Sequence, residues 1–323
     1  MIKPLEITAF FDGSPGHEKQ TRGILAALAA RTVITVAEQR VARKGLPAAA
    51  RDWISCYLAI RTRPAQPDQG RGERLLLGTG SRTHPAMIAC RRPGDRLVTC
   101  MSPARCFLDG FDLCLIPEHD RPTARDNILV TIGPPGTGKD RGRHQRDRGL
   151  ILVGGADAGS HRWNSPALIS RIGRLLKSDG SMSWTISSSP RTPHECEVRL
   201  ASLAAGREGV SFHAFAETHP GWIEERYDEC AVAWVTADSV SMIFEALTAG
   251  CKVGILPVDW KKPENKFQRC IDLLAAQQRV VTWEKWKECE GKGQLQWPTG
   301  PPLEEAERCA GEILRRWWPE RLR

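Results

Sequence analysis

The 323-residue sequence lacks the features that mark several special classes of protein. It contains no uninterrupted apolar segment near the roughly 18 to 20 residues that span a bilayer, which argues against a transmembrane protein. Its start leads directly into an apolar strand pattern, without the long apolar stretch and small-residue cleavage site of a secretion signal. The eleven cysteines are odd in number and include no C-x-x-C pair. We therefore expect a cytoplasmic protein with reduced, mostly buried thiols, rather than a disulfide framework or a thiolate metal site.

Composition and charge indicate an ordinary globular protein with a basic surface. The hydrophobic fraction is 41% and the charged fraction 26%, and the length suffices for about two domains. The net charge of +8 comes with arginine clusters at 61–74, 141–148 and 315–323. These clusters indicate either a solvated surface or one that meets phosphate groups or an anionic membrane, with the protein peripheral at the inner membrane face. No nucleic-acid partner is expected.

Short apolar strands alternate with helical patterns along the whole chain, which is typical of α/β proteins with parallel sheets. In the first half we predict strands over 5–11, 74–78, 96–101, 111–117 and 127–131, and a helix over 18–30. In the second half we predict strands over 150–153, 183–187, 210–215, 231–236, 252–258 and 279–283, and helices over 166–177, 240–249 and 264–277.

The segment 138–149, GKDRGRHQRDRG, contains no apolar residue and is predicted to link two domains. The predicted organisation is an N-terminal domain over 1–137, this basic linker or hinge, a C-terminal domain over 150–302, and a last helix within 303–323. That helix can pack on either domain, including back on the N-terminal one.

The stretch GPPGTGK at 133–139 is spelled like the P-loop of a nucleotide triphosphatase. A working P-loop needs a helix directly after the lysine and a hydroxyl that binds Mg²⁺. Here a charged run with Gly142 follows, and Asp140 takes the place of the hydroxyl residue. The pattern therefore favours an interdomain hinge over an ATPase site.

Glycine-rich turns follow three predicted strands, where ligands of open α/β sheets bind. The first, DGSPGHE at 12–18, offers Asp12 or His17 as a general base, since imidazole titrates near working pH. The second runs from Gly78 through Gly80, and the third contains Gly154 and Gly155. Together they indicate a cleft between two sheets, whereas each alone is also explained by a tight turn without a ligand.

The stretch TADSVS at 236–241 joins a predicted buried strand to a predicted helix. Asp238 or Ser239 suits the N-cap of that helix, and its hydroxyls and unpaired N–H groups provide a place for a diphosphate. Glu245 follows one to two turns later, within reach of a ribose. The alternative is a capped crossover with no ligand.

Six motifs occur in the order found in a known family. They are D-G-x-x-G-H-E-x-Q at 12–20, PEHD at 117–120, NILVTIG at 127–133, GG at 154–155, SSPRTP at 188–193 and TADSVSMIFEA at 236–246. On these motifs the sequence resembles the mitochondrial-fission ELM-type family, whose bacterial members are described as glycosyltransferases. The same loops are similar in placement to those of the GT-B enzyme that transfers N-acetylglucosamine to a lipid-linked acceptor in peptidoglycan synthesis.

The resemblance implies two Rossmann-like domains whose parallel sheets face a central cleft, as in GT-B enzymes, with the donor on the C-terminal domain and the acceptor on the N-terminal one. His17, or as second choice Asp12, would deprotonate the acceptor hydroxyl. The implied donor-binding residues are Gly154, Gly155, Ser188, Arg191, Asp238, Ser239, Ser241, Met242 and Glu245. The implied acceptor or cleft residues are Gly13, Gly16, Gly80, Ser81, Arg82, Glu118 and His119.

We therefore predict a glycosyltransferase that moves a sugar from a nucleotide-sugar donor to a cell-surface glycan or lipid-linked acceptor. No metal or other cofactor is expected, because the sequence has no D-x-D motif of the metal-dependent kind. The alternatives are a non-catalytic organising or binding protein of the same fold, a sugar-nucleotide epimerase or hydrolase, and a P-loop ATPase.

Overall fold

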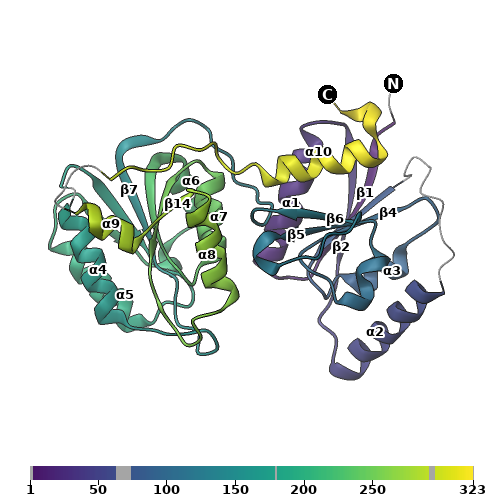
Figure 1. The fold of residues 1–323 in the computed structure, drawn as a ribbon, viewed down its shortest axis with the longest axis horizontal. Coiled ribbons are helices and arrows are strands. Elements are labelled where there is room, and N and C mark those ends of the chain that lie inside the picture. Colours follow the sequence, from purple (N-terminus) through teal and green to yellow (C-terminus); the bar gives the residue numbers. More distant parts are fainter. Residues whose placement is uncertain (1–2, 63–73, 179, 291–294, 323) are drawn as a thin grey trace. The chain divides into compact units, whose positions relative to one another are not determined.

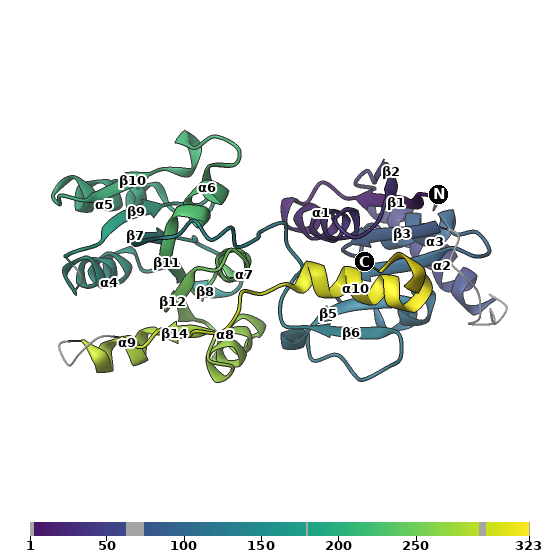
Figure 2. The same ribbon diagram turned by 90° about the horizontal axis from the view of Figure 1, so that it is seen from above.

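The computed structural model describes residues 3–62, 74–178, 180–290 and 295–322. The chain forms two compact units: unit 1 comprises 1–137 and 304–323, and unit 2 comprises 138–303. Each unit contains a six-stranded parallel sheet covered by helices (Figures 1 and 2). The predicted α/β class with two Rossmann-like units built on parallel sheets is confirmed.

Unit 1 has the strand order β2-β1-β3-β4-β5-β6. Its strands are β1 (Leu5–Phe11), β2 (Ile34–Arg40), β3 (Arg74–Thr79), β4 (Arg96–Cys100), β5 (Leu113–Pro117) and β6 (Ile128–Thr131). Its helices are α1 (Pro15–Ala29), α2 (Leu46–Arg61), α3 (His84–Cys90) and α10 (Glu305–Trp317), with 3₁₀ turns η1 (Arg105–Gly110), η2 (Glu118–Asp120) and η4 (Pro319–Arg321).

Alternate residues of these strands face two separate apolar layers, because side chains of a strand point to opposite faces. Leu75 and Leu77 of β3 pack with α1 and α10 on one face, whereas Leu76 packs with α2, α3 and η1 on the other. The C-terminal helix α10 lies beside α1 and completes the core of unit 1, with Ile313 and Leu314 fully buried (Figure 2).

Unit 2 has the strand order β10-β9-β7-β11-β12-β14. Its strands are β7 (Gln145–Leu152), β9 (Ser183–Ser187), β10 (Val210–His213), β11 (Cys230–Thr236), β12 (Lys252–Leu256) and β14 (Val280–Thr282), with a small antiparallel pair β8 (His161–Arg162) and β13 (Asp259–Trp260). Its helices are α4 (Ser165–Ser178), α5 (His194–Ala205), α6 (Trp222–Glu229), α7 (Val240–Thr248), α8 (Lys266–Ala276) and α9 (Trp283–Cys289), with the 3₁₀ turn η3 (Phe215–Glu217). Helices α4, α5 and α9 cover one face of the sheet, and α6, α7 and α8 the other (Figure 1).

The linker predicted over 138–149 is wrong at its C-terminal end, because β7 already begins at Gln145. The first four residues of β7 are polar and exposed, and only the last four are buried. The first half of this strand therefore has the composition of a linker. No helix follows Lys139, since the described chain continues as a loop into β7. That loop therefore lacks the helix on which a P-loop depends.

The basic clusters are partly paired with acidic groups. Arg141 donates to the Asp228 carboxylate at 2.8 Å, and Arg148 donates to the Glu229 carboxylate at 3.3 Å. Both Arg315 and Arg316 bond Glu312. Most of the cluster at 61–74 lies outside the described residues.

All eleven cysteines fall within the described residues and are free thiols, eight of them buried, as the sequence predicts. Burial raises the pKa of several of these thiols, for example that of Cys100 to about 12, which keeps them protonated. Within the described ranges, none of the helices has the length and apolar character that crossing a membrane requires.

Candidate functional site

Each sheet has one position where the chain changes the direction in which it adds strands. In unit 1, β2 lies on one side of β1 and β3 begins the other side; in unit 2, β9 lies on one side of β7 and β11 begins the other. Ligands of open parallel sheets bind outside the carboxyl ends of the strands at such a position. The loops after β1, β3 and β7 are the glycine-rich turns that the sequence predicts to carry function, and the loop after β11 belongs to the predicted TADSVS stretch at 236–241.

Asp12 and His17 form a hydrogen-bonded pair after β1. His17 Nδ1 lies 2.9 Å from Asp12 Oδ2, and the Ser14 N–H donates to Asp12 Oδ1 at 3.0 Å. The Asp12 side chain is buried, whereas that of His17 is 26% exposed. When Nδ1–H donates to the carboxylate, Nε2 is the basic nitrogen of the imidazole. The arrangement thus makes His17 the group with an available basic atom and Asp12 the group that orients it.

The loop after β3 completes this arrangement. Arg82 donates to the Asp12 carbonyl at 3.2 Å, and its Nε lies 3.8 Å from the carboxylate. Burial alone would raise the pKa of Asp12, but hydrogen bonds from His17 and Ser14 and the charge of Arg82 outweigh it and lower that pKa. Gly80 has φ +87°, and a Cβ there would lie 2.4 Å from His17 Nδ1, so only glycine lets the loop pass the imidazole.

The other predicted acceptor residues are placed less closely. Gly13, at φ +79°, shapes the turn after β1, and Gly16 lies in the first turn of α1. Ser81 is exposed. Glu118 and His119 form part of η2, which follows β5, two strands from β3 in the sheet order. A site that included them would extend along the edge of the sheet.

We expect unit 1 to lose stability as pH falls from about 6.5 to about 4, because the unfolded chain then binds a proton on His84 that the buried imidazole does not bind. This imidazole is 1% exposed, and its Nε2 lies 3.1 Å from Thr99 Oγ1. Burial, with a smaller contribution from His17, lowers the pKa of His84 to about 4. The unfolded chain binds the proton near pH 6.5, so this stabilisation is complete above that pH and lost below it, by about 3 kcal/mol.

Urea unfolding followed by circular dichroism between about pH 7 and pH 4.5 measures this loss. The variant His84→Gln should show a flatter dependence on pH than the parent protein. In the control His194→Gln, the replaced side chain is 89% exposed, and the dependence should be unchanged. Equal slopes for His84→Gln and the parent would assign the acid sensitivity to other groups.

In unit 2, the loop after β7 is bonded to the end of β11 and to the loop that follows it. The Gly154 N–H donates to Thr236 Oγ1 at 2.7 Å, and the Gly155 N–H donates to Asp238 Oδ2 at 3.0 Å. A Cβ on Gly154 would lie 2.3 Å from the Asp238 carboxylate, which explains the glycine at this position. The carboxyl ends of the adjacent strands β7 and β11 are thereby held together, at the position where the strand order changes direction.

Arg191 reaches the same place from the loop after β9. Its guanidinium donates to Asp238 Oδ2 at 2.9 Å and to the Gly155 carbonyl at 3.1 Å. The side chain is nevertheless 44% exposed, so part of it is open to solvent. Ser239 Oγ lies 3.4 Å from the guanidinium. Four predicted donor-binding residues are therefore brought together: Gly155, Arg191, Asp238 and Ser239.

The N-terminus of α7 differs from the prediction in its capping. Ser239 occupies the N-cap position, but neither its side chain nor that of Asp238 caps the helix, because Asp238 points to Gly155 and Arg191 instead. The other Asp238 oxygen, Oδ1, is buried and has no hydrogen-bond partner among the described residues. The first N–H groups of a helix have no intrahelical acceptor, so this end of α7 can receive an anion.

The remaining predicted donor residues have different surroundings. The buried hydroxyl of Ser188 donates to Glu197 Oε1 at 2.6 Å and accepts from the Phe215 N–H at 2.9 Å, so it is used within the protein. Ser241 is exposed on the first turn of α7, and Met242 and Glu245 are half-buried further along.

Sequence reasoning missed Ser189, Thr192 and Thr236 as supports of this site. Thr192 accepts from the Ser189 N–H at 2.8 Å and donates to the Gly154 carbonyl, which fixes the loop that carries Arg191. The motifs at 188–193 and 236–246 contain all three residues, but their partners lie on loops distant in the sequence. Across the described residues, no group of three or more His, Cys, Asp or Glu is arranged to hold a metal ion.

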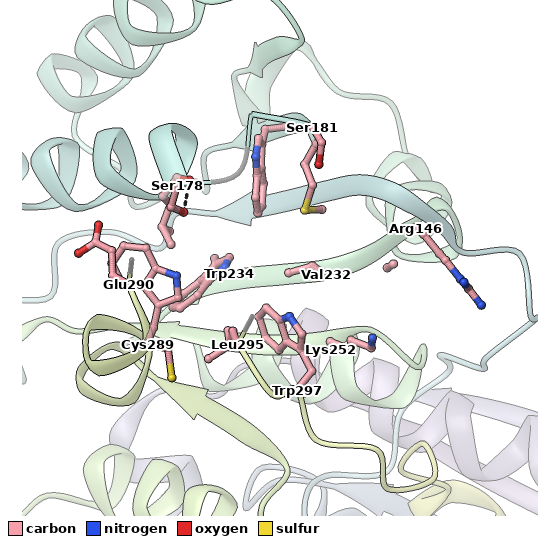
Figure 3. Close-up of a pocket in the computed structure, with 15 residues that line it drawn as sticks. Arg146, Ser178, Ser181, Val232, Trp234, Lys252, Cys289, Glu290, Leu295 and Trp297 are labelled. Atoms are coloured by element: carbon pink, nitrogen blue, oxygen red, sulfur yellow. Dashed lines mark hydrogen bonds between the residues drawn. The ribbon is translucent and has the colours of Figure 1, made fainter. Parts of the chain in front are cut away.

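A separate pocket of about 690 Å³ lies in unit 2 near the starts of β7, β9, β11 and β12, at the opposite ends of the strands (Figure 3). Trp234 and Val232 lie at its centre, with Trp297 beside Lys252, and Arg146 extends away at one end. None of the predicted site residues lines it. Its volume is therefore no guide to the donor site.

Residues 15–317 match the model of the protein family described as Mitochondrial fission ELM1. No curated protein sequence matches the chain.

Solved structures of sugar-nucleotide epimerases share the fold. A proposed UDP-N-acetylglucosamine 2-epimerase from Listeria monocytogenes superposes with a TM-score of 0.56 at 11% identity, over 97% of both chains. The UDP-GlcNAc 2-epimerase from Methanocaldococcus jannaschii gives 0.51 at 12% identity, over 96% of this chain and 100% of that chain. The same enzyme in complex with UDP-GlcNAc and UDP gives 0.50 at 11% identity, over 97% and 100%. At such identities the likeness shows a common GT-B-type fold.

Proposed function

This chain belongs to the mitochondrial fission ELM1 family, and we propose that it transfers a sugar from a nucleotide sugar to an acceptor hydroxyl of a glycan or lipid-linked saccharide. The observation that carries the proposal is the group formed by Gly155, Arg191, Asp238 and Ser239 at the N-terminus of α7. An exposed cation beside a helix N-terminus, at the reversal point of a parallel sheet, suits a diphosphate. The bound UDP-GlcNAc and UDP of the Methanocaldococcus jannaschii epimerase support a nucleotide sugar as the ligand.

On the donor side, Arg191 and the first N–H groups of α7 would bind the diphosphate. Asp238 would act as a positioning residue, because its carboxylate holds Gly155 and Arg191 and would repel a phosphate placed directly against it. Glu245, one to two turns along α7, would accept hydrogen bonds from the ribose hydroxyls. The negative charge that develops on the departing diphosphate would be stabilised by Arg191 and the helix end, without a step through a metal.

On the acceptor side, His17 Nε2 would take the proton of the acceptor hydroxyl as its oxygen attacks the anomeric carbon. The bond from that carbon to the diphosphate breaks, the bond to the acceptor oxygen forms, and the nucleoside diphosphate leaves. Asp12 would stabilise the resulting imidazolium through the 2.9 Å contact with Nδ1.

A sugar-nucleotide 2-epimerase is the second candidate, favoured by the likeness of the fold to such enzymes. The two reactions differ in what they require. Epimerisation changes the configuration of the sugar in the absence of any acceptor, whereas transfer consumes an acceptor and releases a nucleoside diphosphate. Incubation of the full chain with UDP-GlcNAc alone, analysed by NMR, separates them: formation of the C2 epimer supports the second candidate.

Isothermal titration of the full chain with UDP, GDP and UDP-GlcNAc tests the donor site. We expect at least one nucleotide to bind, and Arg191→Gln to weaken its binding about tenfold or more, because a hydrogen bond to a charged group contributes about 1.5 to 3 kcal/mol. Arg199→Gln is the matched control, since this exposed arginine lies on the nearby helix α5. Absence of binding by all three, in the parent protein, would favour a non-catalytic organising protein.

A further inference from the structure

Helix α2 is held to unit 1 by a narrow contact. Cys56 is its only buried residue, and Tyr57 and Ile60 are half-buried against α3 and η1. The helix lies at the margin of unit 1, on the side of the sheet opposite α10 (Figure 1). A helix of 16 residues usually buries a full apolar stripe, whereas α2 buries one residue. Most of the α2 surface is therefore not covered by unit 1.

Large apolar side chains lie on this exposed surface. Leu46 is 87% exposed, Ile54 55%, Leu58 54% and Trp53 45%. Residues 46, 50, 54 and 58 recur every four positions, so they follow one side of the helix. Trp53 lies at the edge of this row, where its ring is 5.1 Å from that of Phe107 in η1. These side chains form a continuous apolar face along α2.

The charges around this face are mainly positive. Between residues 43 and 61 the basic residues are Arg43, Lys44, Arg51 and Arg61, and the acidic residue is Asp52. Lys44 bonds Asp52 at 2.6 Å, which leaves an excess of positive charge beside the apolar side chains. A protein partner would need an apolar groove lined by acidic groups, whereas an anionic lipid surface offers apolar chains and negative head groups together.

We propose that α2 docks unit 1 on an anionic lipid bilayer, with Leu46, Ile54 and Leu58 entering the boundary between head groups and acyl chains. A helix with a tryptophan-containing apolar face and flanking arginines is suited to lie in this interface. Each flanking Lys or Arg contributes to the attraction of the negative surface. The inference is independent of the donor and acceptor sites, because α2 carries none of their residues.

Sedimentation of the full chain with vesicles tests the proposal. We expect the protein to sediment with phosphatidylcholine vesicles that contain phosphatidylglycerol and to remain in the supernatant with phosphatidylcholine alone. Ile54→Ser with Leu58→Ser should weaken binding about tenfold or more, since two apolar side chains no longer enter the interface. Arg51→Gln should weaken it about fivefold, and added salt should reduce binding of the parent protein.

Matched controls separate docking from folding. Val198→Ser on α5 replaces an apolar side chain that is 51% exposed, and should leave vesicle binding unchanged. Urea unfolding of the Ile54→Ser, Leu58→Ser variant, followed by circular dichroism, reports whether the chain remains folded. Undiminished sedimentation of that variant would overturn the proposal. Parent protein that does not sediment with anionic vesicles would also overturn it. If that variant then formed a smaller oligomer than the parent, α2 would bind a second copy of the chain.

Discussion

Replacement of His17 by alanine is expected to reduce sugar transfer about 10²- to 10⁴-fold while leaving donor affinity nearly unchanged. The imidazole lies in unit 1, where Asp12 binds Nδ1 at 2.9 Å, and the proposed diphosphate site lies in unit 2. A general base acts on the acceptor hydroxyl in the transition state, so its loss lowers kcat without weakening donor binding. Initial rates of nucleoside diphosphate release, together with nucleotide titration, measure the two effects separately.

Asp12→Asn extends this test without removing the base. The asparagine preserves the volume at a buried position but no longer favours Nδ1–H on the imidazole, so the rate should fall and the pH dependence of kcat should change. The control His194→Ala removes an imidazole that is 89% exposed in unit 2, and should retain the parent rate. Transfer that persists in His17→Ala would exclude His17 as the base, whereas loss of donor affinity as well would indicate a structural role.

The fold was predictable where apolar side chains reveal the elements. Strands β1, β3 and β11 consist mainly of buried apolar residues, and each is followed by a glycine or hydroxyl turn. The predictions omitted β2 and α2, because most residues of β2 are exposed and α2 buries only Cys56. The polar, exposed start of β7 indicates a linker for the same reason. Elements that contribute little to the core lack the hydrophobic periodicity from which helices and strands are predicted.

The site was predictable in its residue types but not in its bonding. The sequence presents Asp12 and His17 as alternative bases, since nothing in the six residues from Asp12 to His17 determines that one side chain orients the other. It presents Asp238 or Ser239 as the N-cap of α7. Ser239 occupies that position without a side-chain cap, and the Asp238 carboxylate accepts from Gly155 and Arg191, which lie 83 and 47 residues away. Such partners meet only because the strand order places the ends of β7, β9 and β11 side by side.

Gly155→Ala is expected to weaken nucleotide binding about a hundredfold or more, although the change adds one methyl group. The new Cβ would lie 2.0 Å from the carbonyl carbon of Arg191 and 2.4 Å from the Thr192 nitrogen, which are backbone atoms that cannot turn aside. The loop after β9 must then move, and the Arg191 guanidinium loses its positions against the Gly155 carbonyl and Asp238. Overpacking of this kind also costs about 1 to 3 kcal/mol of stability in unit 2.

The matched control for this prediction lies in the same loop. A Cβ on Gly159 would meet the Asp157 carboxylate at 3.3 Å, and this exposed side chain can rotate away, so Gly159→Ala should bind nucleotide almost as the parent protein does. Titration of both variants, with urea unfolding of each, distinguishes a local change at the diphosphate site from general destabilisation. If Gly155→Ala bound nucleotide with the parent affinity, the ligand would not approach the ends of β7 and β11, and the donor site would have to be sought elsewhere in unit 2.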